Sequence, residues 1–223
     1  MKFSFLLPDF ILLIKATTTR IIQVIFSAII LFTVWIMFKI TIPYFSFRYD
    51  IGFLLTKQAI LHMDIWRWSF YTHIASSIFV LLFGVFQFIK PLLESFPKLH
   101  KLLGKAYVFI ILFLSAPSGL VMAFYANGGI YAKTSFIIIS LLWWLFTFVA
   151  FLKIRNRKIK GHIDFMIRSY ALTLSAITLR TYVLILPAFI HLHAKEMYTL
   201  VAWLSWVPNL IIAEVIIYYK VFK

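Results

Sequence analysis

Three histidines and two arginines stand within or beside long apolar stretches, where ionisable side chains are rare. His73, His100 and His162 lie in three different stretches, and Arg168 and Arg180 follow His162 in the run HIDFMIRSYALTLSAITLR. A guanidinium near the middle of a bilayer is costly, so it normally faces a bundle interior, a partner or a water-filled cavity. This run is therefore the first place to look for function.

Imidazoles on separate membrane helices suggest b-type haem. Such haems are held by histidines, with glycines where the macrocycle passes and arginines that meet its propionates. The candidate cofactor-binding residues are His73, His100, His162, Arg180, Gly84 and Gly104. His100 and His162 share one predicted depth, and His191 or His193 is a candidate second ligand for His73. The alternative is that histidines at helix ends cap carbonyls or contact lipid phosphate.

Polar residues in the last two apolar blocks define a second layer. At a helical rise of 1.5 Å per residue, Arg168 and Glu214 fall at the same depth, which predicts an ion pair with Gln87 nearby. Asn209 falls near mid-membrane. Arg180 cannot reach this layer and lies closer to the level of His73. It either lines a functional pocket or bonds backbone carbonyls exposed by a kink at Pro117.

The elements that carry these residues are membrane helices. The 223 residues are 63% hydrophobic and 13% charged, and the apolar residues form blocks of about 20, the length that crosses a hydrocarbon core. We predict an all-α, polytopic bundle with spans at 21–40, 69–89, 102–125, 135–152, 165–189 and 198–219. Residues 1–20 form a cytoplasmic or interfacial segment, and 21–223 form a single transmembrane domain.

The net charge of +15 is distributed unevenly between the predicted loops. Most lysines and arginines fall on one side, including the run KIRNRKIK at 153–160, which predicts that this side and both termini are cytoplasmic. The run favours anionic lipid headgroups over nucleic acid as its partner. The sequence has no cysteine, which excludes thiolate chemistry and iron–sulfur clusters. We expect a multi-pass membrane protein.

Two other functional classes remain open. A small-solute or proton transporter would use His73, Arg180, Asn209 and Glu214 along a path, although neither an internal repeat nor a pair of broken helices is visible in the sequence. A non-catalytic subunit of a larger membrane complex would explain the 25 phenylalanines without chemistry. The motifs of serine hydrolases, zinc proteases and nucleotide-binding enzymes are absent from the sequence.

Several of these segments resemble a known family. The pieces HIASSIFVLLFGVFQF from His73, HKLLGKAYV from His100, the run from His162 and AWLSWVPNLIIAE are similar, in order and spacing, to bacterial integral membrane proteins catalogued as domain of unknown function 2306. The resemblance covers 71–219. The family usually has basic and aromatic residues where this chain has Ile163, Asp164 and Phe165. The resemblance implies a polytopic membrane protein of the bacterial inner membrane and no particular activity.

Overall fold

The computed structural model describes residues 24, 25, 27–89 and 94–219, and the regular elements of these residues are all helical. Six helical segments in this part of the chain are long and apolar enough to cross a membrane, as predicted. They are Ser27–Ser46, Asp64–Phe86, Pro97–Phe124, Ile130–Arg155, Ile159–Ala188 and Ala194–Tyr218. The predicted segment 1–20 lies outside the described residues.

Most of the helices extend beyond the predicted spans. The second begins at Asp64 rather than at 69, and the fifth begins at Ile159 rather than at 165. Hydropathy detects only the part of a helix that crosses hydrocarbon, whereas the helix continues through the headgroup region, where charged side chains such as Arg67 reach water. His73 therefore lies about 14 Å from the start of its helix at Asp64.

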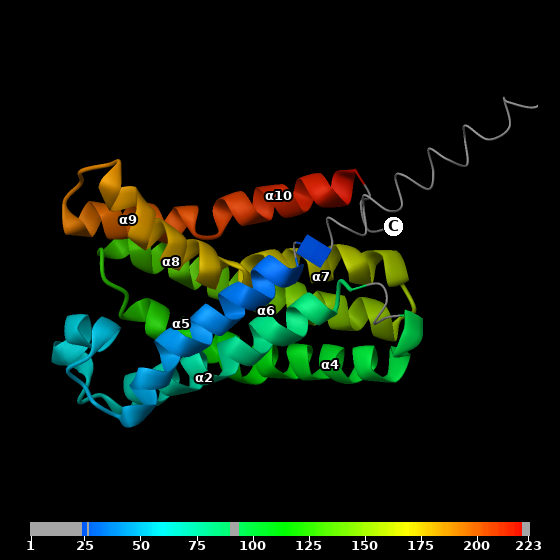
Figure 1. Ribbon diagram of the computed structural model, residues 1–223, viewed down its shortest axis with the longest axis horizontal. Coiled ribbons are helices and arrows are strands. Elements are labelled where there is room, and N and C mark those ends of the chain that lie inside the picture. The colour runs from blue at the N-terminus through cyan, green and yellow to red at the C-terminus, as the bar shows by residue number, and fades with distance from the viewer. Residues whose placement is uncertain (1–23, 26, 90–93, 220–223) are drawn as a thin grey trace, which may run out of the picture.

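The helices pack as one antiparallel bundle (Figure 1). Its core elements are α2 (Asp64–Phe86), α4 (Pro97–Ile110), α5 (Ala116–Phe124), α6 (Ile130–Arg155) and α7 (Ile159–Thr173). The most extensive contact joins α6 to α7, and α2 packs on α4 and α5. Outside them lie α8 (Ser175–Ile185), α9 (Ala194–Leu204) and α10 (Val207–Tyr218). We call the end that carries the turn 156–158 the basic end and the opposite end the aromatic end.

The third span is distorted where α4 meets α5. The backbone there follows a π-helical turn, η3 (Ile111–Ser115), in which each N–H bonds the carbonyl five residues earlier. Pro117 has no N–H for the carbonyl of Leu112, and the indole Nε1 of Trp144 donates to that oxygen instead, at 3.1 Å. The distortion predicted at Pro117 is thus present, and a side chain of α6 satisfies the freed carbonyl.

The fifth and sixth spans each contain an irregular turn near the middle of their length. The regular helix is interrupted at Leu174 between α7 and α8, where the dihedral angles remain helical (φ −65°, ψ −13°), and at Ser205 and Trp206 between α9 and α10, where φ of Trp206 is −130°. Asn209 connects the two breaks, because its Nδ2 donates to Thr178 Oγ1 at 2.9 Å and also to the carbonyls of Ala171 and Ser205. The sequence did not show this pair of broken helices.

A ring of hydrogen bonds lies in the core between α4, α6 and α7. Trp143 Nε1 donates to Thr173 Oγ1 at 3.0 Å, and the Tyr107 hydroxyl lies 2.9 Å from both Thr173 and Ser169. Ser169 contacts Thr147 at 2.7 Å, and Thr147 donates to the carbonyl of Trp143. Thr173 Oγ1 also lies 3.1 Å from the backbone carbonyl of Ser169, which accepts a hydrogen bond from it. The ring is therefore a structural clamp that joins α4, α6 and α7.

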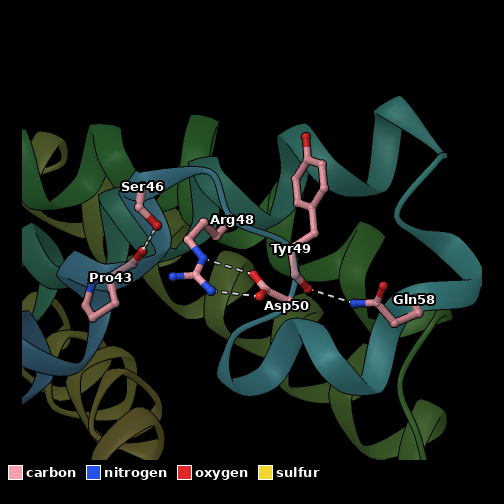
Figure 2. Close-up of polar contacts among 6 residues, drawn as sticks. All are labelled: Pro43, Ser46, Arg48, Tyr49, Asp50 and Gln58. Carbon is pink, nitrogen blue, oxygen red and sulfur yellow. Dashed lines mark hydrogen bonds and ion pairs between the residues drawn. The ribbon is translucent and has the colours of Figure 1, made fainter.

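Residues 42–63 fold over the aromatic end in two short helices, η1 (Ile42–Ser46) and η2 (Gly52–Ile60). Figure 2 shows Arg48 forming two hydrogen bonds to Asp50 on the surface of this segment, while Gln58 donates to the carbonyl of Tyr49. On the inner side Lys57 is 3% exposed, and its Nζ donates to Tyr125 O and Asn127 Oδ1, both at 2.6 Å. Lys57 thus attaches η2 to the loop between α5 and α6.

Candidate functional site

Of the two arginines predicted to lie inside the membrane, Arg168 and Arg180, Arg180 forms fewer hydrogen bonds within the described chain. It lies on α8, about 12 Å from the end of its span at Ala188, and is partly buried. Its Nη1 donates to the carbonyl of Ala176, one turn earlier on the same helix, at 3.1 Å. Among the described residues this is its single hydrogen bond, so four of the five guanidinium N–H groups lack a protein acceptor.

Three carboxylates of the described chain form ion pairs with other arginines. The three ion pairs there are Arg48 with Asp50, Arg67 with Asp64, and Arg168 with Glu214. No described carboxylate forms a salt bridge with Arg180. A guanidinium that is withdrawn from water without a counter-ion is costly, so the local environment favours an anion.

The proposed structural role for Arg180 at the Pro117 kink is not what the structure shows. The backbone carbonyls near the kink accept hydrogen bonds from other side chains. The carbonyl of Leu112 accepts from Trp144, and that of Leu114 accepts from Ser118 at 2.5 Å. The carbonyl of Ser115 accepts from both His73 and Ser118. Arg180 contacts none of these carbonyls. Its guanidinium interacts electrostatically with His73 and with Tyr44, in each case less strongly than burial affects the charge.

His73 faces the same region from α2. Its Nδ1 lies 2.9 Å from the carbonyl of Ser115, which can only accept, so Nδ1 carries the hydrogen and Nε2 of a neutral ring has a free lone pair. The ring lies against Gly119, where an added Cβ would be 3.0 Å from His73 Cε1. Ser76 and Ser115 complete this layer with a hydroxyl contact of 2.7 Å.

Tyr44 approaches from the first span and was not singled out in the sequence. Its hydroxyl accepts a hydrogen bond from the backbone N–H of Phe53 at 2.9 Å, and its ring meets Phe70 edge-on at 5.4 Å. Arg180, His73 and Tyr44 thus come from α8, α2 and the first span. They form the candidate site, a cation beside an imidazole and a phenol. In the sequence Tyr44 is only an aromatic residue near the end of a span, which is a weak signal in a chain with 43 aromatic residues.

The second predicted layer is partly assembled. Arg168 and Glu214 form the expected ion pair through two hydrogen bonds, Nε to Oε1 at 2.6 Å and Nη2 to Oε2 at 2.7 Å. The guanidinium also lies over the ring of Phe165 at 4.9 Å. Gln87 instead bonds the carbonyl of Phe83 and lies against Gly104. Asn209 joins the broken helices, so this layer has a packing role.

The histidines at the basic end are held differently from each other. His162 Nδ1 lies 2.9 Å from the carbonyl of Ala150 and ties α7 to α6. His100 Nδ1 is buried with no hydrogen-bond partner in the described chain, and His100 interacts electrostatically with His162. A shared binding site for these two histidines stays a prediction. The described residues contain no group of three metal-ligating side chains.

The space beside Gly84 and Gly104, the two glycines predicted to contact haem, is filled by side chains of the protein. An added Cβ on Gly84 would meet the ring of Tyr170, with Cδ2 at 2.5 Å, and Tyr107 Cε2 at 3.0 Å. Gly104 faces Gln87, whose Oε1 would be 2.8 Å from the added Cβ. These glycines let side chains of neighbouring helices pack closely, so they do not provide the open gaps that a porphyrin needs.

The architecture is that of a polytopic integral membrane protein whose helices pack directly on one another. A family model described as "Predicted membrane protein (DUF2306)" matches residues 70–217, more than half of the chain. The protein belongs to this family, which confirms the resemblance of its motifs. No curated protein and no solved structure matches the chain.

Proposed function

We propose that this protein is a membrane carrier for an anionic solute and that Arg180 is the fixed positive charge of its binding site. The observation that carries the proposal is the partly buried guanidinium with one hydrogen bond and no carboxylate partner in the described chain. A carboxylate or phosphate group accepts two parallel hydrogen bonds from a guanidinium, which would satisfy the donors that the protein leaves open.

The interrupted spans support transport. Secondary transporters often place substrate near helices that are broken at the bilayer midplane, where unwound backbone and half-helix ends face the ligand. Here α7–α8 and α9–α10 are broken at similar depths and are cross-linked by Asn209. Arg180 lies on α8, about one and a half turns beyond its break. We also propose that the basic end faces the cytoplasm and anionic lipid.

Charge displacement on a solid-supported membrane tests this function. Proteoliposomes would receive rapid jumps from a neutral solution to carboxylates and phosphates of increasing size. In the wild-type protein we expect currents whose sign corresponds to negative charge that moves into the liposomes. These currents should be lost in Arg180→Gln. Arg48→Gln is the matched control, because it removes one cation from the same end of the bundle at a side chain that is 65% exposed. Equal currents in wild type and Arg180→Gln would refute the proposal.

A second candidate, haem b binding for electron transfer, is favoured by one specific observation. His73 and His162 each donate Nδ1–H to a backbone carbonyl, the arrangement that fixes the tautomer of ligating histidines and leaves Nε2 as the ligand atom. The filled surroundings of Gly84 and Gly104 weigh against it. A Soret band and a reduced α-band in the purified protein, diminished by His73→Ala, would support haem; a colourless folded preparation made with haem available would exclude it.

A further inference from the structure

The route by which an anion reaches Arg180 is limited at the aromatic end. Residues 42–63 cover this end, and their packing is dense: Leu54, Trp66 and Phe70 are each at most 2% exposed. Phe70 stacks on Trp66 at 5.5 Å and meets Tyr44 at 5.4 Å. Tyr44 packs against this cluster, which covers the end of the bundle toward which the Arg180 span runs. The cluster therefore stands between the guanidinium and the solution at this end.

Lys57 strengthens the attachment of residues 42–63, which form the cover of the aromatic end. Its two hydrogen bonds of 2.6 Å connect η2 to the loop that follows α5, and its ammonium lies 5.4 Å from the ring of Phe53. Asn127, one of its acceptors, also donates to Thr56. The segment is therefore attached at both sides of the bundle end, through the first span and through this loop.

The side of the bundle toward the lipid is less closed. Arg180 belongs to α8, which has no buried residue, and its neighbours Val183 and Leu184 are 49% and 78% exposed. The first span, which carries Tyr44, also turns large apolar side chains outward, including Trp35 and Phe38. A partly exposed guanidinium in this position is bordered by surfaces that suit hydrocarbon.

Given the anion site proposed above, we infer that its ligand is an amphiphile, an anionic headgroup on an alkyl chain, which reaches Arg180 sideways from the lipid. The headgroup supplies the missing negative charge, and the chain remains along the apolar surfaces of α8 and the first span. A carboxylate and a phosphate monoester share this chemistry. Such a ligand never has to pass the aromatic cover.

Equilibrium binding to the full-length protein in nanodiscs tests the inference. The probes are acetate, octanoate and dodecanoate, with inorganic phosphate and dodecyl phosphate as the second headgroup series. When a ligand binds from the lipid, its affinity, calculated from the free concentration in water, rises about three- to fourfold for each methylene group that is buried. We expect dodecanoate or dodecyl phosphate to bind at least 100-fold more tightly than acetate or inorganic phosphate, and Arg180→Gln to weaken this binding at least tenfold relative to Arg48→Gln.

If Arg180→Gln fails to fold, a competition experiment on the wild-type protein alone still tests the inference. Dodecyltrimethylammonium has the same chain and the opposite charge, so it should not displace dodecanoate; effective displacement would overturn the inference. Arg180-dependent binding of acetate or inorganic phosphate as tight as that of the long-chain anions would also overturn it, while leaving the anion carrier intact. Absence of any Arg180-dependent binding would refute both.

Discussion

Gly84→Ala tests how closely the second, third and fifth spans pack. The added methyl group would lie 2.5 Å from Tyr170 Cδ2, in contact with Cε2, and 3.0 Å from Tyr107 Cε2. Both rings are buried, at 5% and 0% exposure, so neither can move into solvent or lipid. Overpacking of this kind costs about 1–3 kcal/mol, against about 1 kcal/mol gained from replacing glycine by alanine in a helix.

We therefore expect Gly84→Ala to lower the free energy of unfolding by up to about 2 kcal/mol. Gly161→Ala is the control, because the nearest atom to its added Cβ is Cδ of the flexible Lys153 side chain, at 3.2 Å. The assay is unfolding in mixed micelles followed by tryptophan fluorescence. Adding Tyr170→Leu to Gly84→Ala should recover part of the loss, since the two changes are coupled through one contact. Equal stability of the two alanine variants would refute the packing argument.

Three further predictions concern other contacts. Arg168→Ala or Glu214→Ala alone should cost about 1–2 kcal/mol in mixed-micelle unfolding, and the double variant less than the sum, since a single change leaves one charge unpaired; additive losses would contradict the pairing. Thr173→Val breaks the hydrogen-bond ring and should cost about 1–3 kcal/mol, whereas Thr181→Val, an exposed threonine bonded only to its own helix, should be nearly neutral; similar thermal midpoints would contradict the clamp. Burial, and secondarily the charge of Lys133, lower the pKa of Lys57 to about 8. The unfolded chain, with a lysine pKa of about 10.4, then holds more protons between pH 8 and 10, so stability should rise with pH in this window and Lys57→Met should flatten the rise; the same slope in both proteins would contradict it.

The depth of a polar residue along its helix was predictable from the sequence, whereas the direction in which the residue faces around the helix axis was not. Helical rise is nearly constant, so counting residues correctly placed Arg168 at the level of Glu214. The rotation of a helix depends on which side chains fill which spaces across the bundle. Sequence periodicity carries little of this information in a helix that is apolar on all sides, and for that reason the ring of Tyr170 in the notch of Gly84 was not foreseen.

The interruptions of the last two spans show a second limit. Pro208 in WVPN was a signal for the break at Ser205 and Trp206, because proline prefers the first turn of a helix. The break at Leu174 has no glycine or proline beside it. It depends on tertiary hydrogen bonds such as that from Asn209 to the carbonyl of Ala171, which a single sequence does not reveal.

The stoichiometry of anion binding tests the central claim most directly. Equilibrium dialysis of the purified protein against a radiolabelled long-chain carboxylate, in nanodiscs and with protein-free nanodiscs subtracted, counts the anions held per chain. The uncompensated charge of Arg180 predicts one saturable site per chain in wild type and in Arg48→Gln, and none in Arg180→Gln. A saturable site that persists unchanged in folded Arg180→Gln would contradict the claim, as would the absence of any site in the wild-type protein.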